Sequence, residues 1–350
     1  MCDYEFLYIT RCKEKPLPGS KYCILHTPFP EDRNSEEFKC IAKLKEEKVK
    51  EKVKNGDFNF EGAILLSVDF SGMTIKGDII FINAIILEDI KFVRATIGGN
   101  AWFEGCTIVE DTVFYRVIIG GTVSFEEARI GKNVLFSKSK VKRNAWFEGS
   151  KIGGDILFNE AEIRGDAQFS TLDVQGEFSF KEAIFKEPQA EENTCRAARR
   201  HYEKFGDRET ADYYFLREMR ARRRQKGKIA QFLEWMIADF TCRYGTDSIR
   251  PVVIWLILVL GVFPCIYYFG HGITASHPFF SLFPRAEKSF ASAEYFSVVT
   301  ATTLGYGDLQ PTLTTLWHIP IFRVLASLEA IFGTFMWVIF LTVFARKYMR

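Results

Sequence analysis

The stretch FEGCTIVEDTVFYRVIIGGTVSF, from Phe103 to Phe125, has a phenylalanine at every eleventh position. The same spacing extends through the first half of the chain without a gap, at positions 70, 81, 92, 103, 114, 125, 136, 147, 158, 169 and 180. A period of eleven can describe a right-handed helical coil. Glycines recur between the phenylalanines, however, and would break a long helix. The intervening residues therefore decide the fold.

A branched apolar residue follows each phenylalanine by five positions. These residues are Ile75, Ile86, Ile97, Ile108, Ile119, Ile130, Val141, Ile152, Ile163 and Val174. Small residues often stand two positions before them, and the steps alternate between five and six residues, except that Phe60, Leu65 and Phe70 are five apart. The pattern resembles the pentapeptide-repeat family, which implies a right-handed four-sided β-helix over residues 56–187, with large side chains along its axis. Eleven such repeats predict five or six coils at a spacing of about 4.8 Å.

Residues 56–186 hold 19 acidic and 14 basic residues. This balance is too even to favour imitation of nucleic acid, as in some members of the family, over a scaffold that docks a partner. A stack of this kind needs caps at its ends. The charged segment 28–55, which ends at Asn55-Gly56, is the candidate helix for the first cap.

Two long apolar segments follow in the second half of the chain. Val252 to Phe269 has no charged residue, and Val324 to Phe344 has the single charge of Glu329. Segments of this length fit a bilayer core of about 30 Å and are hard to explain as helices of a soluble core. We therefore expect a multidomain protein in which an α-helical two-span pore domain, residues 250–350, follows the β-helix.

Basic residues give the expected orientation of the spans. Twelve Lys or Arg lie between positions 196 and 228, and Arg346, Lys347 and Arg350 follow the second span. Between the spans stand only Arg285, Lys288 and Arg323. The chain opens without the basic and apolar regions of a signal peptide. We expect a cell-membrane protein with both termini in the cytoplasm and residues 271–320 outside.

Residues 188–249 should connect the β-helix to the first span. Asn193–Phe205 and Asp207–Arg224 are predicted helices separated by a C-cap glycine and an N-cap aspartate. The arginines of this hairpin could meet anionic lipid or simply solvate its surface. Lys228–Phe240 has apolar residues along one helical face, which favours a helix lying on the inner leaflet over one packed on its own domain.

The stretch TATTLGYGD, from Thr300 to Asp308, is polar and rich in glycine, yet it lies between the two spans. Non-helical backbone at membrane depth must line water or lie inside protein. Gly305 and Gly307 permit positive φ at alternate positions, so that consecutive carbonyl groups can point to one side. Four chains could then stack rings of oxygen atoms that replace the water shell of a cation.

Tyr295 to Asp308 (YFSVVTATTLGYGD) resembles the pore helix and selectivity filter of the potassium channel family, with Leu304 in place of the usual valine. The resemblance implies a homotetramer that conducts K⁺ through Thr303, Leu304, Gly305, Tyr306 and Gly307. It also implies a short pore helix near 291–302 and filter support from Thr302, Asp308, Tyr295 and Phe296.

The second span adds two candidate residues. Gly333 matches the gating hinge of the family's inner helix. Glu329, one turn earlier, is an intramembrane acid of the kind that usually faces protein or water. It is expected either to be hydrogen-bonded to a pore helix or to attract cations in the pore.

Cys2, Cys12, Cys23 and His26 have the spacing C-x9-C-x10-C-x2-H, and RCKEKPLPGSKYCILH resembles the WRC-type Cys3His zinc motif. Three thiolates and one imidazole suit a closed, structural Zn²⁺ site, in preference to unligated cysteines. Residues 1–27 are therefore expected to form a small zinc knob. Nucleic-acid binding, which accompanies the motif in its relatives, is not expected from this segment alone.

These features predict a potassium-selective, tetrameric channel with Zn²⁺ as a structural ion and no catalytic activity. We expect its cytoplasmic part to regulate it, through an unidentified cytoplasmic protein or ligand. The alternatives are a nonselective cation channel and a membrane-anchored docking scaffold with a closed pore.

Overall fold

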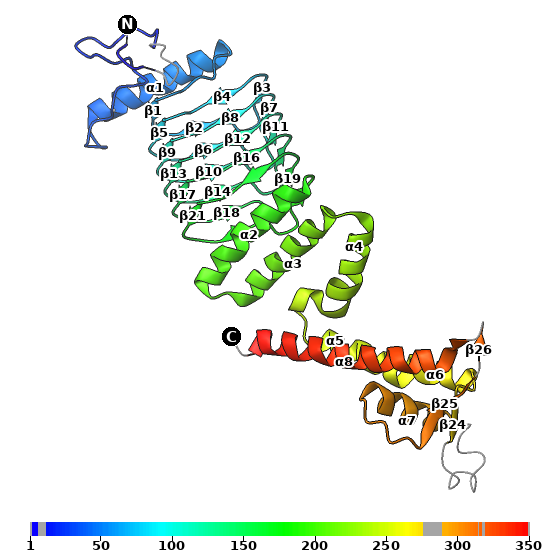
Figure 1. The fold of residues 1–350 in the computed structure, drawn as a ribbon. Coiled ribbons are helices and arrows are strands. Elements are labelled where there is room, and N and C mark those ends of the chain that lie inside the picture. Colours follow the sequence, from blue (N-terminus) through cyan, green and yellow to red (C-terminus); the bar gives the residue numbers. More distant parts are fainter. Residues whose placement is uncertain (1, 6–11, 276–288, 314, 317–318, 349–350) are drawn as a thin grey trace. The chain divides into compact units, whose positions relative to one another are not determined.

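The computed structural model describes residues 2–5, 12–275, 289–313, 315–316 and 319–348. Arg285, Lys288 and Arg350, whose charges gave the expected orientation of the spans, lie outside the described residues. The chain divides into two compact units, Met1–Gln225 and Lys226–Arg350 (Figure 1). Each unit is considered by itself.

The first unit contains a four-sided β-solenoid built from two-residue strands, as the repeat predicts (Figure 1). One sheet consists of β1 (Ile64–Leu65), β5 (Ile85–Ile86), β9 (Thr107–Ile108), β13 (Arg129–Ile130), β17 (Lys151–Ile152) and β21 (Asp173–Val174). The next consists of β2 (Val68–Asp69), β6 (Ile90–Lys91), β10 (Thr112–Val113), β14 (Val134–Leu135), β18 (Ile156–Leu157) and β22 (Phe178–Ser179). The third consists of β3 (Thr74–Ile75), β7 (Thr96–Ile97), β11 (Ile118–Ile119), β15 (Lys140–Val141), β19 (Glu162–Ile163) and β23 (Ile184–Phe185). The fourth consists of β4 (Ile79–Ile80), β8 (Ala101–Trp102), β12 (Val123–Ser124), β16 (Ala145–Trp146) and β20 (Ala167–Gln168).

The register of the parallel strands follows the lengths of the repeat steps. In most of the solenoid, paired residues are separated by two full periods of the phenylalanine pattern, as in the pair Thr74 and Thr96. In the first coil the separation is one residue shorter, as in the pair Ile64 and Ile85. The missing residue is the one that the five-and-five step from Phe60 to Phe70 leaves out. The β-helix prediction is therefore confirmed, and the short step in the sequence corresponds to a shorter first coil.

The phenylalanines form two stacks inside the solenoid. Successive rings in each stack lie 4.5 to 5.3 Å apart between centroids. Rings from the two stacks meet edge to face, as Phe103 and Phe114 do at an interplanar angle of 89°. Both arrangements are favourable for aromatic rings and add to the gain from burying them. The branched residues five positions after each phenylalanine are also buried, together with others such as Ile79, Ile90 and Val123.

The helix α1 (Glu36–Lys54) covers part of the first coil, and Ser35 caps its N-terminus by accepting from the Phe38 amide. Lys45 turns inward from this helix and is 2% exposed. Its Nζ donates to the carbonyl oxygens of Ile64 and Thr27, both at 2.6 Å, and of Leu25 at 3.3 Å. A buried amine therefore satisfies carbonyl groups at the open end of the stack.

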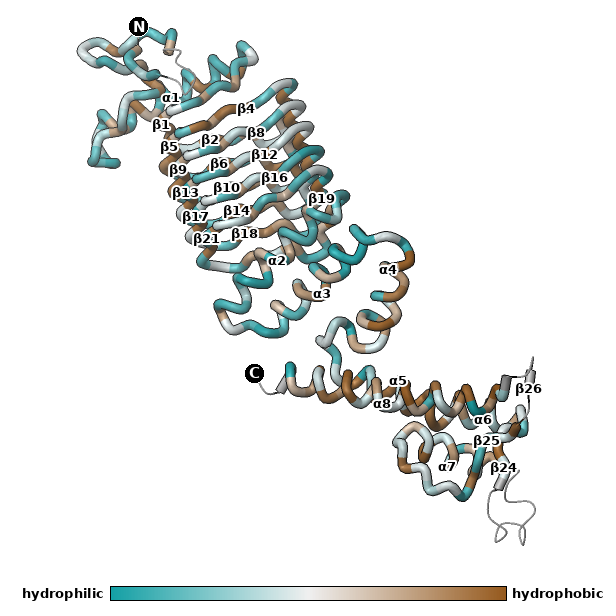
Figure 2. The backbone as a smooth tube through the Cα atoms, in the orientation of Figure 1, coloured by the Kyte–Doolittle hydropathy of each residue, from teal (hydrophilic) through white to brown (hydrophobic). Residues whose placement is uncertain are grey.

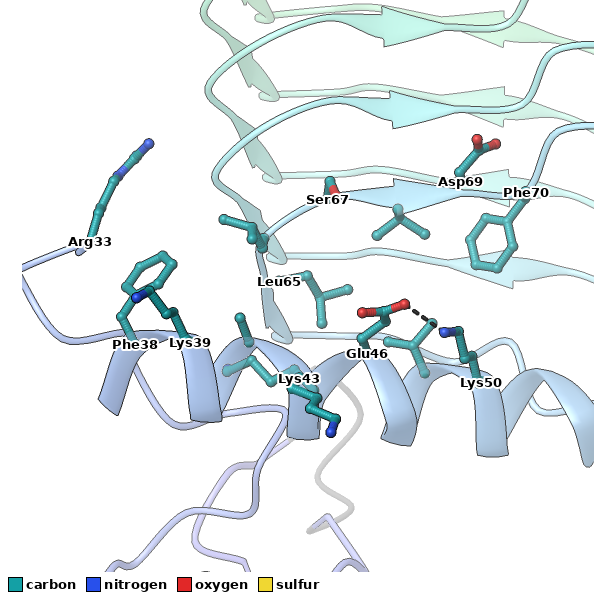
Figure 3. A pocket seen from close by; sticks show the side chains of 15 residues that line it. Arg33, Phe38, Lys39, Lys43, Glu46, Lys50, Leu65, Ser67, Asp69 and Phe70 are labelled. Atoms are coloured by element: carbon teal, nitrogen blue, oxygen red, sulfur yellow. Dashed lines mark hydrogen bonds and ion pairs between the residues drawn. The ribbon is translucent and has the colours of Figure 1, made fainter. Parts of the chain in front are cut away.

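The α1 helix does not cover the whole end of the solenoid. A cavity of about 630 Å³ remains between α1 and the edge strand β2 (Figure 3). Phe38, Leu65 and Phe70 line it together with basic side chains, and Glu46 pairs with Lys50 beside it.

The last coil is capped by a hairpin of α2 (Pro188–Phe205) and α3 (Arg208–Arg224), joined at Gly206 in the left-handed conformation. The Phe180 amide donates to the Tyr214 hydroxyl at 2.8 Å. The Arg217 guanidinium donates to the carbonyl oxygens of Phe180 and Ala183 at 2.7 and 2.8 Å. The hairpin thus closes the C-terminal end of the stack, a role that its sequence did not reveal.

Several hairpin arginines have a role other than contact with lipid or solvent. Glu218, 6% exposed, accepts from Nε of both Arg196 and Arg199 at 2.9 Å. Glu191, 8% exposed, pairs with Arg217 and Arg224. Buried carboxylates need such partners. These arginines hold the two helices together and are not free to serve as a lipid-binding patch.

The second unit begins with α4 (Lys228–Glu234), which continues into the π-helix η1 (Trp235–Phe240) and the short turn η2 (Arg243–Gly245). Among the described residues, two helices are long and apolar enough to cross a membrane, Ile249–Phe269 and Ile321–Arg346. The first consists of α5 (Ile249–Ile257), the π-helix η3 (Leu258–Val262) and α6 (Phe263–Phe269), and the second lies within α8 (Ile321–Tyr348). In Figure 2 the colours of these segments are mostly hydrophobic, whereas α2 and α3 are largely hydrophilic.

Between these two helices lies α7 (Phe290–Ala301). The connections around it form two small antiparallel sheets, β24 (Ile273–Ala275) with β25 (Leu309–Pro311), and β26 (Thr315–Leu316) with β27 (Ile319–Pro320). A core of Tyr267, Ala293, Phe296, Leu309 and Phe322 joins these elements. The pore-helix prediction, near 291–302, thus falls on a helix of nearly the same bounds.

We predict that Lys45→Met weakens the first coil. The loss of three donated hydrogen bonds leaves buried carbonyl groups without a donor, at a cost of about 1–3 kcal/mol. Hydrogen–deuterium exchange of the full chain should show faster exchange in residues 60–70. Lys43→Met on the same helix, at an exposed position, is the matched control and should leave exchange unchanged. Equal exchange in both variants would contradict the role of Lys45.

Candidate ion pathway and metal centre

The loop that follows α7 alternates in backbone conformation. Thr303, Gly305 and Gly307 have φ of 58°, 54° and 79°, and the residues between them are not in the positive region. Gly305 and Gly307 thus have the positive φ that was expected at alternate positions of this loop. Thr302 ends the helix, and its hydroxyl donates to the carbonyl oxygen of Val298 at 2.6 Å.

The other two residues of the expected filter, Leu304 and Tyr306, lie at the surface of the single chain. Leu304 is 58% and Tyr306 is 68% exposed. Tyr295, from α7, has its hydroxyl within hydrogen-bonding reach of the Asp308 carboxylate. Phe296 lies elsewhere, buried against Tyr267 at 5.0 Å with the rings nearly perpendicular. Tyr295 and Asp308 are thus brought together beside the loop, while Phe296 holds α7 against α6.

Glu329 is fully buried among three helices of the same chain. Its carboxyl accepts from the Tyr267 hydroxyl of α6 at 2.7 Å and contacts the Ser297 hydroxyl of α7. The Ser297 hydroxyl also lies 2.8 Å from the carbonyl oxygen of Val259, in η3. This acid was expected either to be hydrogen-bonded to a pore helix or to face the pore. Its contact with Ser297 corresponds to the first position, because α7 is the candidate pore helix. Tyr267 and Ser297 were missed by the sequence reasoning, although a tyrosine and a serine facing an acid inside apolar segments could have suggested them.

Gly333 lies where α8 passes the end of α7. A Cβ atom at this position would overlap the carbonyl oxygen of Ala301. The helix α8 continues without a break through Gly333. Gly333 therefore allows α8 and α7 to approach closely in this conformation. This packing role is separate from a role in bending α8.

Cys2, Cys12, Cys23 and His26 come together in one buried group, with their ligand atoms within 4.8 Å of one another. The Sγ atoms of Cys12 and Cys23 are 3.9 Å apart, and Nδ1 of His26 lies 3.5 Å from Sγ of Cys2. A tetrahedral zinc ion with Zn–S bonds of about 2.3 Å separates its sulfur ligands by about 3.8 Å. The four side chains therefore fit one tetrahedral metal ion.

The contacts of His26 leave its Nδ1 atom available as a metal ligand. Its Nε2 lies 3.0 Å from the Glu61 carbonyl oxygen, so a hydrogen there leaves the lone pair on Nδ1. The Tyr4 ring stacks on the imidazole at 4.1 Å. Burial lowers the pKa of His26 and raises the pKa of the Cys12 and Cys23 thiols. Three neighbouring thiolates would need a positive charge, which a metal ion held by Cys2, Cys12, Cys23 and His26 would supply.

The metal group is not separate from the solenoid. Cys2, Cys12, Cys23 and Leu25 belong to the same apolar core as Phe60 and the first coil. The Ile64 amide also donates to the Leu25 carbonyl oxygen at 2.8 Å. The Cys3His group therefore packs directly on the end of the stack that α1 covers.

Comparison with known families follows this division of the chain. Residues 252–350 match the family model described as an ion channel, and residues 60–107 and 92–140 match pentapeptide repeats. Neither family description names a catalytic activity. No curated protein and no solved structure matches the chain. With its two apolar helices this is a membrane protein, in which an ion-channel domain follows a pentapeptide-repeat β-solenoid.

Proposed function

We propose that the chain forms a homotetrameric, potassium-selective channel whose filter is the segment Thr303 to Gly307. The alternating φ values of this segment, at the end of a short helix between two apolar helices, carry the proposal. In such a filter the carbonyl oxygens of residues 303–306 replace the water around a K⁺ ion, and the Thr303 hydroxyl completes the innermost ring. The ion-channel match over residues 252–350 supports this function.

The exposure of the filter supports assembly around an axis. Leu304 and Tyr306 are large apolar residues left uncovered by their own chain, and neighbouring subunits would cover them. The dipole of α7 places partial negative charge at its C-terminal end, beside Thr302, which favours a cation there. Tyr295 and Asp308 would support the loop from behind.

Both termini are proposed to lie in the cytoplasm, with α4 and η1 along the inner leaflet. Ile229 is 79% exposed, and Phe232, Leu233, Met236, Ile237 and Phe240 are all exposed as well. An apolar face of this size in water is unfavourable, and the headgroup boundary of a bilayer would cover it.

Gating is proposed to reach the pore through the inner helix. Arg346, near the end of α8, donates from Nη1 to the Tyr244 carbonyl oxygen at 2.9 Å. Tyr244 belongs to η2, in the connection from the cytoplasmic part, where Arg243, Tyr244 and Gly245 all have positive φ. This contact would transmit a displacement of the connection to α8, and Gly333 would be the point at which α8 bends.

Zn²⁺ is the ion proposed for Cys2, Cys12, Cys23 and His26. With four protein ligands and no open position, its chemistry there is structural. The four residues would join the N-terminal segment to the first coil and help close the end of the solenoid.

The first test is conduction by the purified protein in a bilayer with K⁺ on one side and Na⁺ on the other. We predict a reversal potential near the K⁺ equilibrium value and block by barium. Gly305→Ala should abolish selective current, because an L residue at φ of +54° is strained. Gly261→Ala is the control, since a Cβ there meets no atom within 4 Å. Current that reverses near zero would mean a nonselective cation channel, and a silent tetramer would favour the docking scaffold.

The second test concerns the metal. We predict that Cys12→Ser lowers the zinc content of the purified chain from about one ion per chain and speeds hydrogen exchange in the first coil as well as in the N-terminal segment, because both share one core. Cys40→Ser, an exposed free cysteine, is the matched control and should retain the ion. Full zinc content in Cys12→Ser would overturn the assignment.

The third test separates packing from bending at Gly333. Gly333→Ala is predicted to lower the thermal stability of the pore domain as well as its open probability, because the new Cβ meets the Ala301 carbonyl oxygen. A role in bending alone would lower the open probability and leave stability equal to that of Gly261→Ala. Detergent melting curves and single-channel recordings of both variants distinguish the two.

A further inference from the structure

Four polar groups form one chain inside the apolar core of the channel domain. They are the Val259 carbonyl, the Ser297 hydroxyl, the Glu329 carboxyl and the Tyr267 hydroxyl, and each contacts the next. Glu329, Ser297 and Tyr267 are fully buried. No salt bridge includes Glu329 in the part of the chain that the structure describes. The chain of contacts joins η3, α7, α8 and α6.

The Val259 carbonyl needs a donor from outside its own helix. In the π-helix η3 the Phe263 amide donates to Leu258, five residues back. In the same register the next carbonyl, that of Val259, faces the nitrogen of Pro264. Proline has no N–H to donate. The Ser297 hydroxyl of α7 takes the place of the missing amide.

The number of hydrogen atoms then decides the state of the carboxyl. Three contacts link the four groups, and each hydrogen bond needs its own hydrogen. The Val259 carbonyl can only accept, while Ser297 and Tyr267 carry one hydroxyl hydrogen each. With an ionised Glu329 two hydrogens serve three contacts, and one of the three contacts has no hydrogen. A hydrogen on the carboxyl completes the set, since Glu329 then donates to Ser297 and Ser297 donates to Val259.

We propose that Glu329 is a protonated positioning residue, whose hydrogen completes the bonds that hold α7 between the outer and inner helices. The protonation state stands on the hydrogen count alone, whereas its effect on conduction rests on the proposed channel function. The surroundings also favour a neutral Glu329 carboxyl group, because burying a carboxylate without a cationic partner costs free energy. Loss of the hydrogen would turn Ser297 toward Glu329 and leave the Val259 carbonyl without a donor.

Other titratable groups on the packed helices are accounted for. On α6 the tyrosine that faces Glu329 is Tyr267. On α7, Tyr295 is directed to Asp308, and Glu294 is partly exposed without an ion pair among the described residues. In α5 and η3 the only charged residue is Arg250, at the start of the helix, and it donates to the Asp239 carbonyl oxygen. None of these contacts offers Glu329 a counter-charge.

The test compares Glu329→Gln with Glu329→Leu in the full chain. Glutamine can accept from Tyr267 and donate to Ser297, as the protonated acid does, so its melting temperature and current should equal those of the unaltered chain. Leucine leaves Ser297 and Tyr267 without their partner and should lower the current by about tenfold or more. If the glutamine variant loses as much as the leucine variant, the proposal is wrong.

An infrared measurement tests protonation directly and does not depend on conduction. The unaltered protein in lipid vesicles at neutral pH should show the C=O stretch of a protonated carboxylic acid, and Glu329→Gln should remove that band. Glu294→Gln, the same change on α7, is the matched control and should leave it in place. A band that persists in Glu329→Gln, or is absent from the unaltered protein, would overturn the proposal even if every variant were silent in a bilayer.

Discussion

Each buried backbone carbonyl and amide needs a hydrogen-bond partner, and the structure of this chain depends on how that requirement is met. Within the solenoid, the backbone groups of each coil form hydrogen bonds with those of the next coil. Two periods of the phenylalanine pattern set the register of these bonds. The two end coils have no neighbouring coil on their outer side. A single buried lysine, Lys45, serves the carbonyl of Ile64 at one end, and Tyr214 and Arg217 serve Phe180 and Ala183 at the other.

The same requirement shapes the channel domain. Pro264 removes a donor from the first apolar helix, and the carbonyl that loses it accepts from Ser297 of α7. Because water does not replace a missing partner in a bilayer, a freed carbonyl draws in another helix. Ser297 in turn needs Glu329, and Glu329 needs Tyr267. One proline thereby explains why three polar side chains lie in an otherwise apolar core.

The solenoid could be predicted because every coil repeats the same local pattern, so even the short step from Phe60 to Phe70 appears in the register of Ile64 and Ile85. The Cys3His group followed from the ligand spacing and from the resemblance to a known zinc motif. A helix within residues 28–55 was expected as the first cap, and α1 lies there, but the contacts that close the two ends could not be predicted in the same way. Arg217 and Lys45 resemble ordinary helix-surface cations in the sequence, and only the positions of the coil ends show that they turn inward. The position of Glu329 was undecided for the same reason, since its partners come from segments 32 and 62 residues away.

In the proposed filter, the protein itself does not supply every backbone carbonyl group with a hydrogen-bond donor. Residues 303–306 have carbonyl groups that, in the proposed tetramer, no amide satisfies, and a dehydrated cation would supply the missing charge. Such backbone keeps its shape only if the surrounding protein holds it. Here α7 precedes the loop, and α7 is held by Ser297 to η3 and Glu329, and by the close approach of Ala301 to Gly333. A movement of α8 that separates Gly333 from Ala301 would therefore act on the loop through α7, so that gate and filter need not be independent.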